Sequence, residues 1–208
     1  MTAPRRVLLL VFLTLVLASP LGAQLPRAEA RERCLGTNPN APVLIEVFSD
    51  HQCPACRRLY LETMRRVIAD YANTGKVCVV YHEFPLRVHA HARTAARYAQ
   101  AAARLGKTKW VEVADRLYYY QSKWAADGQV ESVVAQVLTE KEMAQVRKWV
   151  ADPKLEAAID RDVALGRQRG VRSTPTLFIT ASGHTERVNG VVQYAILQRY
   201  LDRLLARR

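Results

Sequence analysis

The hydrophobic pattern divides the chain into strand-like runs near its two ends and a long helical stretch between them. Residues 43–48 and 77–81 are β-branched apolar runs, which are typical of buried strands. Between them, apolar residues recur at spacings of three to five over residues 55–71, which predicts a helix. These three segments predict a strand–helix–strand unit with parallel strands and a right-handed connection.

The stretch from residue 88 to residue 169 has a helical pattern almost throughout. Gly106, Gly128 and Pro153 separate its segments, because glycine and proline interrupt helices. The predicted helices cover residues 91–105, 110–124, 130–138, 140–150 and 155–169. A run of this length without a strand indicates a helical subdomain inserted into a sheet-containing domain.

The sheet pattern returns after the helical stretch. Residues 175–180 are strand-like, and residues 184–188 fit the edge strand of a hairpin after the turn signal at Ser182 and Gly183. Residues 192–205 predict a closing helix. The order is therefore βαβ, helical insertion, ββα, and the three parts are residues 31–87, 88–169 and 170–208.

The apolar run nearest the N-terminus is of a different kind. Two arginines precede an uncharged, mainly apolar run over residues 7–18, and small residues follow it. This order is typical of a secretory signal peptide, here residues 1–23, with cleavage after Ala23 or after Ala30. A membrane span needs about 20 apolar residues, so the run is short for an anchor, which is the alternative. We therefore expect an exported protein, periplasmic or otherwise extracytoplasmic, or a membrane-anchored one if the signal is uncleaved.

The chain is strongly basic, with a formal net charge of +12. Such a charge attracts acidic partners or anionic lipid, or it is a solvated basic surface. The arginines are scattered through helix-like segments and do not form one run, which favours the solvated surface. No nucleic-acid-binding motif is present in the sequence, so we expect no nucleic acid partner.

Cys53 and Cys56 form the clearest chemical motif. They stand three residues apart where a helix is predicted to begin, and Pro54 fits the first helical position, which needs no backbone N–H. A helix N-terminus stabilises a thiolate, so Cys53 is expected to form a mixed disulfide with a partner and the less exposed Cys56 to resolve it. An inert disulfide is one alternative. Half of a zinc site is another, although no zinc spacing relates the pair to His51, His82, His89 or His91.

A proline opens the strand-like segment that follows the helical stretch. Proline cannot donate to a sheet ladder, so a central strand should not contain it, but Pro175 is tolerated as the first residue of the strand. The Thr174–Pro175 bond is either an ordinary trans bond or a cis bond, and cis bonds usually mark constrained positions.

Four segments resemble the DsbA-like disulfide oxidoreductases of the thioredoxin fold. Residues 48–56 (FSDHQCPAC) look like the active-site segment, and residues 170–179 (GVRSTPTLFI) look like the cis-proline loop of that family. Residues 35–43 and 81–86 resemble the segments that flank them. With a short strand near Cys34, the resemblance implies a thioredoxin-like α/β fold with helices on both faces of the sheet and an inserted helical subdomain.

The resemblance also implies roles for individual residues. Cys53 is the implied nucleophile and Cys56 the implied resolving thiol. The Thr174–Pro175 bond is implied to be cis, and the backbone at Thr174 is implied to pair with an extended substrate strand. The two residues between the sulfurs, which are expected to tune the redox potential, are Pro54 and Ala55.

The chain departs from the family at the proton relay. Relatives commonly carry a buried acid six residues before the first cysteine, and Val47 occupies this position here. Glu46 is one residue away, so it is expected on the opposite face of the strand. Glu83, at the end of the neighbouring strand, is the other relay candidate, and a surface carboxylate is the alternative for it.

Cys34 and Cys78 are the remaining cysteines. The resemblance implies that Cys34 ends the first strand and that Cys78 lies in the strand beside it. Neighbouring strands are about 4.8 Å apart, within the usual Cα separation of a disulfide, about 4.4–6.8 Å. We expect a second disulfide between them, the alternative being a buried free Cys78 and a mobile Cys34.

The expected activity is that of a protein thiol–disulfide oxidoreductase, an oxidase that donates the Cys53–Cys56 disulfide to exported substrate proteins. A reductase or isomerase of the same fold is one alternative, and a chaperone or copper-binding module that uses the same thiols is another. We expect no metal and no cofactor beyond the redox-active disulfide. The expected protein is a monomer with a membrane redox partner that reoxidises or reduces the dithiol.

Overall fold

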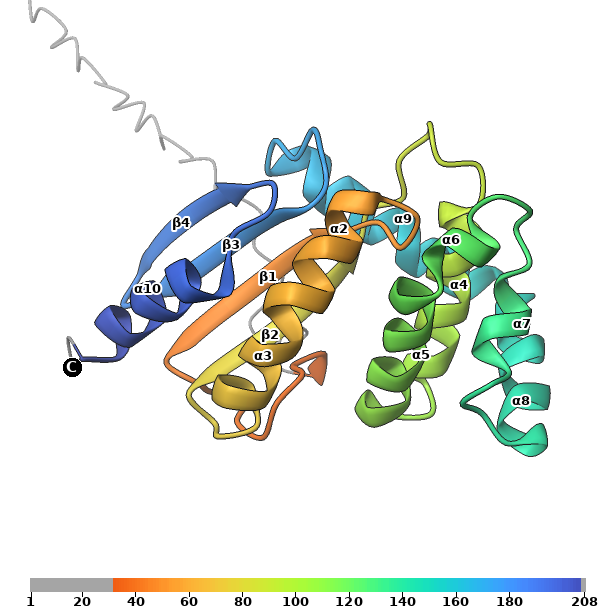
Figure 1. Ribbon diagram of the computed structural model, residues 1–208, viewed down its shortest axis with the longest axis horizontal. Coiled ribbons are helices and arrows are strands. Elements are labelled where there is room, and N and C mark those ends of the chain that lie inside the picture. Colours follow the sequence, from red (N-terminus) through yellow and green to blue (C-terminus); the bar gives the residue numbers. More distant parts are fainter. Residues whose placement is uncertain (1–31, 207–208) are drawn as a thin grey trace, which may run out of the picture.

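A computed structural model of the chain describes residues 32–206, and its centre is a four-stranded sheet (Figure 1). The strands lie in the order β2-β1-β3-β4. They are β1 (Val43–Ser49), β2 (Val77–Glu83), β3 (Thr176–Ala181) and β4 (His184–Asn189). The predicted signal peptide and both of its cleavage sites lie outside the described residues.

The strand pairing agrees with the pattern in the sequence, except near Cys34. Strands β1 and β2 are parallel, whereas β1 with β3 and β3 with β4 are antiparallel. The strand predicted near Cys34 is a single bridge, in which the Leu35 N–H donates to the Val79 carbonyl at 2.7 Å. The chain turns away at the next residue, Gly36, which has a φ of +151° and approaches the Ala72 carbonyl so closely that a Cβ would lie 2.8 Å from it.

The helix after β1 is continuous but not uniform. It consists of α2 (Pro54–Leu59), η1 (Tyr60–Met64), α3 (Arg65–Val67) and η2 (Ile68–Ala72), and the two η segments are π-helical. Leu59 and Met64 are five residues apart and both are buried. A π turn places residues five apart on one face, which explains the irregular spacing in the sequence.

The insertion between β2 and β3 contains only helices among the described residues. They are α4 (Ala92–Ala103), α5 (Lys107–Tyr119), α6 (Gln121–Trp124), α7 (Val130–Val134), α8 (Glu140–Val150) and α9 (Pro153–Gln168). The helix predicted over 110–124 is therefore divided, because Tyr120 leaves the helical conformation. The helix predicted over 130–138 is shorter, since α7 ends at Val134.

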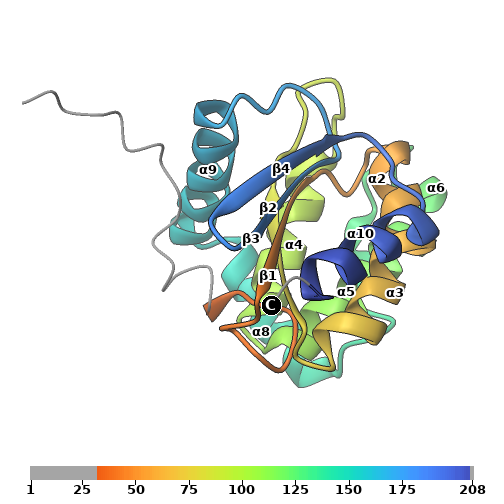
Figure 2. The ribbon, with the colours of Figure 1, turned by 90° about the vertical axis from the view of Figure 1, so that its left-hand side faces the viewer.

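Helices cover both faces of the sheet, as the thioredoxin-like prediction requires (Figure 2). One face packs against α2, α10 (Tyr194–Ala206) and the part of the insertion before α9, and its core includes Val43, Ile45 and Val47. Phe48 faces the other way, toward α9. Gly166 lets α9 lie close to that face, because a Cβ there would come within 2.6 Å of the Phe84 ring.

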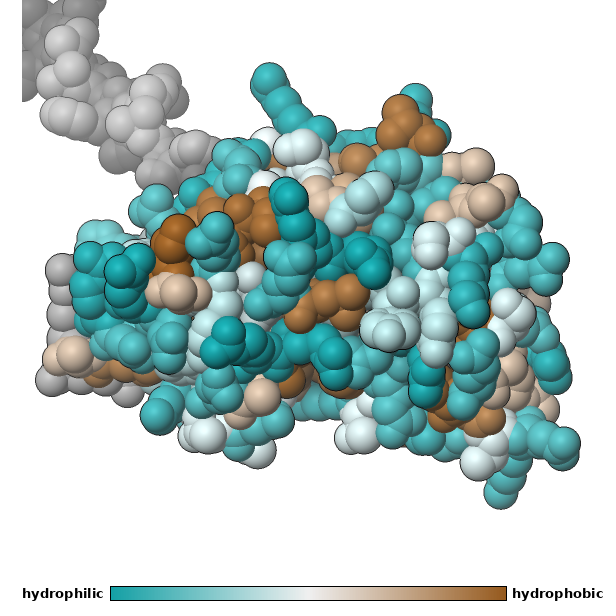
Figure 3. Space-filling view, viewed as in Figure 1, coloured by the Kyte–Doolittle hydropathy of each residue, from teal (hydrophilic) through white to brown (hydrophobic). Residues whose placement is uncertain are grey.

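The front of the molecule is mainly hydrophilic. Figure 3 shows teal side chains over most of this face, with a smaller brown apolar patch between α10 and the start of α2. Among residues 32–206, no helix has the length and apolar character needed to cross a membrane.

Candidate active site at the start of helix α2

The two cysteines of the CxxC motif lie where β1 gives way to α2. Cys53 is the N-cap of α2, in extended conformation, and Pro54 occupies the first helical turn. The Cys53 N–H donates to the Asp50 carbonyl at 3.1 Å, which closes the turn before the helix. Cys53 is 7% exposed and Cys56 is 1% exposed, so Cys53 is the sulfur nearer to solvent.

The surroundings of Cys53 favour its thiolate. The hydrogen bond from the Cys56 thiol is the largest cause that lowers the pKa of Cys53, to about 5. The Thr174 side chain and the backbone N–H groups of Cys56 and Ala55 lower this pKa further, whereas burial opposes them. A cysteine at a helix N-terminus with such donors is in the range expected for a reactive thiolate.

Cys56 has the opposite character. Burial raises the pKa of Cys56 well above its usual value, and the neighbouring Cys53 raises it further. The Asp50 N–H donates to the Cys56 sulfur at 3.4 Å. The reduced pair therefore holds one thiolate, on Cys53, and one thiol, on Cys56.

The proline loop, which is far from the dithiol in the sequence, lies beside it in the structure. The Thr174–Pro175 bond is cis, so the trans alternative is wrong. The Cys53 sulfur lies 3.5 Å from the Thr174 carbonyl oxygen, and Thr174 is buried. The Gly190 N–H donates to the Pro175 carbonyl at 2.8 Å, which ties the loop to the end of β4. The structure thus brings together both active-site segments, which are 121 residues apart.

Glu83 is buried and faces the same side of the sheet as the dithiol. Its carboxylate lies 3.3 Å from the His51 imidazole Nε2, and the side chain is only 3% exposed. The alternative of a surface carboxylate is therefore wrong. Glu83 pairs in register with Ser49, the last residue of β1.

Glu46 lies on the opposite face of the sheet. Its carboxylate contacts His82 Nε2 at 3.2 Å and Arg169 Nη1 at 2.8 Å. Burial would raise the pKa of Glu46, but the His82 hydrogen bond and the Arg169 charge lower it overall. The structure therefore places Glu46 away from the dithiol, in an ion network that joins β1 to the end of α9.

The helical insertion holds the active-site turn, which the sequence pattern did not reveal. The Gln121 side chain donates to the carbonyls of His51, at 2.7 Å, and Cys53, at 3.1 Å. The Arg57 guanidinium donates to the Tyr118 carbonyl at 2.9 Å. The Ser49 and Tyr118 hydroxyls are 2.8 Å apart. These partners are about 60 to 70 residues apart along the chain, so local patterns carry no signal for them.

If the CxxC pair were half of a zinc site, further ligands would lie near it, and the described part of the chain places none there. Within residues 32–206, no group of three or more His, Cys, Asp or Glu side chains is placed to hold a metal ion. Both cysteines of the pair instead contact hydrogen-bonding groups, which suits thiol chemistry.

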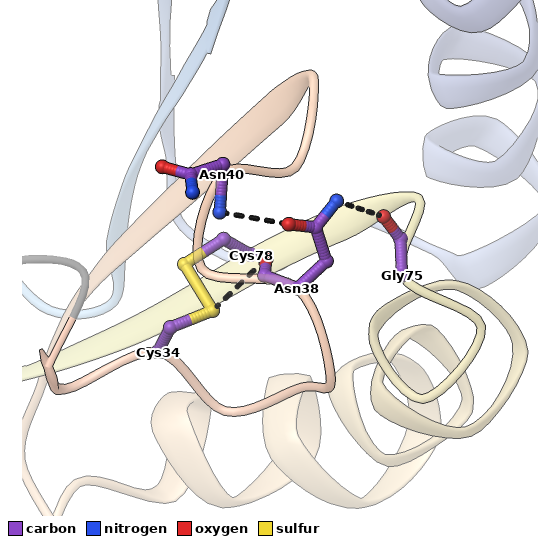
Figure 4. Close-up of a disulfide and its surroundings, with 5 residues drawn as sticks. All are labelled: Cys34, Asn38, Asn40, Gly75 and Cys78. Carbon is purple, nitrogen blue, oxygen red and sulfur yellow. Dashed lines mark hydrogen bonds between the residues drawn. A yellow bond between two sulfur atoms is a disulfide. The ribbon is translucent and has the colours of Figure 1, made fainter.

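A disulfide joins Cys34 to Cys78 at the other end of the sheet (Figure 4). Their Cα atoms are 5.4 Å apart. The Asn38 side chain accepts from the Asn40 N–H at 2.9 Å and donates to the Gly75 carbonyl at 3.2 Å, so it fixes the turn beside the disulfide (Figure 4). Cys78 is next to the first residue of β2, whereas the dithiol follows the last residue of β1, so this disulfide lies apart from the active site.

Comparison with known proteins agrees with this arrangement. The model of a family described as thioredoxin matches residues 30–203. The chain belongs to this thioredoxin family. The predicted thioredoxin-like fold class is confirmed, and the predicted resemblance agrees with the solved structures of this fold that the chain matches, which include DsbA proteins.

Three relatives show how close the similarity is. The probable disulfide bond formation protein D of Bacillus cereus is 23% identical over 159 residues, which are 74% of this chain and 73% of the relative. The structure of α-DsbA1 from Wolbachia pipientis has a TM-score of 0.71 at 19% identity, over 84% of this chain and 91% of that one. A thioredoxin-like oxidoreductase from Silicibacter pomeroyi has a TM-score of 0.63 at 28% identity, over 80% and 88%.

Proposed function

We propose that this protein is an exported thiol–disulfide oxidoreductase that donates the Cys53–Cys56 disulfide to substrate proteins. The observation that carries the proposal is the contrast between the two thiols: the fold stabilises a thiolate on Cys53 and a thiol on Cys56. A dithiol whose reduced form is stabilised in this way belongs to an oxidising disulfide. The name of the Bacillus cereus relative, a probable disulfide bond formation protein, supports the same activity.

The reaction proceeds in two exchanges. A substrate thiolate attacks the Cys53 sulfur, the Cys53–Cys56 bond breaks, and the electron pair leaves on Cys56, which takes up a proton. A second substrate thiolate then attacks the substrate sulfur of the mixed disulfide, and Cys53 leaves as a thiolate. The substrate gains a disulfide, and the protein is left reduced. A low pKa makes Cys53 a good leaving group in the second exchange.

The proline loop is the proposed binding site for the substrate. Thr174 places its carbonyl beside the Cys53 sulfur, so an extended substrate segment that pairs with this backbone presents its cysteine to Cys53. Pro54 is exposed and Ala55 half-buried between the two sulfurs, so both lie where they tune the potential. The apolar patch near the start of α2 suits unfolded substrates, which expose apolar side chains (Figure 3).

Glu83 is the proposed relay acid for Cys56. Relatives carry a buried acid at the position of Val47, and Glu83 takes over its role here. The side chains of Glu83 and Val47 face the same side of the sheet as the dithiol. The His51–Glu83 pair is buried, with the imidazole Nε2 3.3 Å from the carboxylate. Glu46 is not proposed for this role, because the sheet separates it from the dithiol.

The remaining partners follow from the chemistry. Each turnover leaves the dithiol reduced, so a membrane redox partner that reoxidises it completes the cycle. The substrates are exported proteins, since disulfides persist outside the cytoplasm. We propose that the protein acts as a monomer and that it uses no redox cofactor other than its active-site disulfide.

Trapping the mixed disulfide tests the proposed function. A Cys56→Ser protein incubated with a disulfide-bonded peptide is expected to accumulate a mixed disulfide through Cys53, visible by mass, and a Cys53→Ser protein is expected to form none. The oxidised wild-type protein is expected to convert a reduced two-cysteine peptide to its disulfide. A protein that binds the peptide but leaves it reduced would instead be a binding module, and one that only reshuffles existing disulfides would be an isomerase.

A further inference from the structure

Asp50 connects the dithiol to the loop after β2, residues 84–91. It lies in the turn between β1 and α2 and is only 1% exposed. Its N–H donates to the Cys56 sulfur at 3.4 Å, and its carbonyl accepts from the Cys53 N–H at 3.1 Å. Among residues 32–206, no other backbone N–H donates to the Cys56 sulfur. The backbone of one buried residue therefore contacts both cysteines.

The Asp50 carboxylate has hydrogen-bond partners on both of its oxygens. Oδ1 accepts from the Gln52 N–H at 2.7 Å. Oδ2 accepts from the Leu86 N–H at 2.9 Å and lies 2.7 Å from His89 Nδ1. A carboxylate can only accept, so His89 Nδ1 carries a proton and donates it to Asp50. The Asp50 side chain is 0% exposed, so it cannot turn without leaving buried N–H groups unpaired.

The loop that supplies two of these donors is itself fixed at both ends. At its start, the Phe84 N–H donates to the Ser49 carbonyl at 2.7 Å. At its end, the His91 N–H donates to the Gln52 side chain at 2.7 Å. The segment between these two hydrogen bonds carries both donors from the loop to Asp50. The loop therefore holds Asp50 in a single orientation, with its N–H directed at the resolving sulfur.

The first exchange places a negative charge on the Cys56 sulfur. The new bond joins the substrate sulfur to Cys53, the Cys53–Cys56 bond breaks, and the electron pair moves to Cys56. Cys56 is 1% exposed, so water is not there to stabilise the charge, and burial disfavours it. A backbone N–H that already points at the sulfur stabilises this charge without any rearrangement.

We propose that the Asp50 N–H stabilises the charge on Cys56 as this sulfur leaves, and that the Asp50 carboxylate and His89 are positioning groups for this N–H. The contact acts before Cys56 takes up its proton, so it is a separate contribution from the relay proposed for Glu83. The proposal rests on the proposed function, because it concerns the same dithiol.

The first test is the variant Asp50→Asn, which keeps the size of the side chain but removes its charge and one acceptor. The rate at which glutathione reduces each oxidised protein is followed by acid quench, alkylation and mass. Loss of the negative charge alone would favour the Cys56 thiolate and speed the reaction. Loss of the anchor is expected to slow it about tenfold, the effect of a hydrogen bond to a charged group.

Asp152→Asn is the matched control for this variant. Asp152 also accepts from a backbone N–H, that of Lys154 at 2.9 Å, and its carboxylate pairs with Arg104. It is the N-cap of α9 and does not contact the dithiol. Asp152→Asn is therefore expected to be reduced at the wild-type rate.

Two variants of His89 test the anchor from the loop side. The His89 side chain is 21% exposed, so its replacement leaves the core intact. His89→Ala removes the donor to Asp50 and is expected to slow reduction by glutathione about threefold, because the Leu86 N–H remains. His89→Asn keeps an N–H donor near the position of Nδ1 and is expected to restore the wild-type rate. Equal rates for these two variants would overturn the proposal.

The pKa of Cys56 supplies a readout that a general loss of stability would not move in one direction. In a Cys53→Ser background Cys56 is the free thiol, since Cys34 and Cys78 are bonded. The chemical shift of its Cβ over a range of pH gives this pKa, which Asp50→Asn is expected to raise. A lowered or unchanged pKa, an Asp50→Asn protein reduced as fast as wild type, or equal slowing by Asp152→Asn would overturn the proposal.

Glutathione makes this test independent of the proposed function. It reduces the disulfide of an oxidase and of a reductase alike, so the rates decide the role of Asp50 in either case. A wild-type protein that reacts with glutathione but fails to oxidise a two-cysteine peptide would count against the proposed function alone.

Discussion

Cys53 and Cys56 lie one helical turn apart, yet their surroundings give them opposite acid–base behaviour. Hydrogen bonds lower the pKa of Cys53 to about 5, and burial raises the pKa of Cys56. Near neutral pH the reduced protein therefore carries one stabilised thiolate. The disulfide form has no such charge, and this difference supports the proposal that the disulfide is an oxidising one.

The stability of the reduced protein relative to the oxidised protein is expected to depend on pH. Folding lowers the pKa of Cys53, so its stabilising contribution is complete above the ordinary cysteine pKa and is lost as the pH falls through about 5. Urea unfolding of both forms at about pH 7 and about pH 4 measures the difference in unfolding free energy. The reduced form is expected to lose unfolding free energy relative to the oxidised form at the lower pH. An unchanged or opposite difference would contradict the thiolate assigned to Cys53.

Replacement of Glu83 by Gln is expected to slow the proton-dependent step at Cys56 by on the order of 100-fold, the lower end for general acid–base catalysis. Glu46→Gln is the matched control, because Glu46 is also a buried carboxylate of this sheet but faces α9. Stopped-flow reduction of the oxidised proteins over a range of pH gives both rates. Equal pH profiles for Glu83→Gln and Glu46→Gln would remove Glu83 from the relay.

Residue spacing alone could not complete the description of this site. The sequence identifies the dithiol and the proline, because each belongs to a short motif. It also shows that Val47 interrupts the relay position, and period-two alternation places Glu46 on the far face. Burial of Glu83 and the contact between Ser49 and Tyr118 depend on how the insertion packs, and the latter pair is 69 residues apart.

At the scale of elements, α6 stabilises by hydrogen bonds the turn that precedes the dithiol. Replacement of Gln121 by Ala leaves the His51 carbonyl without the donor it has in the structure and removes one donor from the Cys53 carbonyl. Loss of a buried hydrogen-bond partner costs about 1–3 kcal/mol, so the unfolding free energy is expected to fall by about 2 kcal/mol.

Urea unfolding of Gln121→Ala measures this loss, with Ser122→Ala as the control. Ser122 lies on the same short helix but is exposed, so its replacement is expected to change the unfolding free energy by less than about 0.5 kcal/mol. Equal stabilities of the two variants would show that α6 does not brace the turn.

The second disulfide ties the segment before β1 to the edge strand β2. Its loop spans a sequence separation of 44 residues, for which the chain-entropy account gives about 4 kcal/mol of stabilisation. A Cys34→Ser/Cys78→Ser protein is therefore expected to unfold at lower urea concentration, with an unchanged Cys53–Cys56 redox potential, because the two pairs lie at opposite ends of the sheet. An unchanged unfolding midpoint, or a shifted potential, would contradict this purely structural role.

Element boundaries were predictable only where a local signal marks them. The alternating and β-branched runs predict all four strands, and parallel β1 and β2 follow from the helix between them. The π-helical segments η1 and η2 were not predictable, because a spacing of five in an apolar pattern is also what an irregular helix shows. The end of α7 at Val134 depends on tertiary packing, since its apolar pattern continues beyond that residue.

At the scale of the whole molecule, the insertion and the sheet share one continuous core. Trp110 and Leu117 of α5 belong to the same cluster as Val47 and Cys56. The order of elements predicts an insertion, but it does not say that the insertion would form one wall of the active site. The low pKa of Cys53 likewise depends on parts that are far apart in the sequence, because groups of α2 and of the proline loop both lower it.

The equilibrium redox potential of the Cys53–Cys56 pair tests this account most directly. The oxidised protein is equilibrated in glutathione buffers of graded composition, and the fraction reduced is read from the mass of alkylated Cys53 and Cys56. A stabilised Cys53 thiolate predicts a potential near about −120 mV, the value of a strong disulfide donor. A potential near about −270 mV, as in thioredoxin, would contradict the oxidase and show that the protein is a reductase.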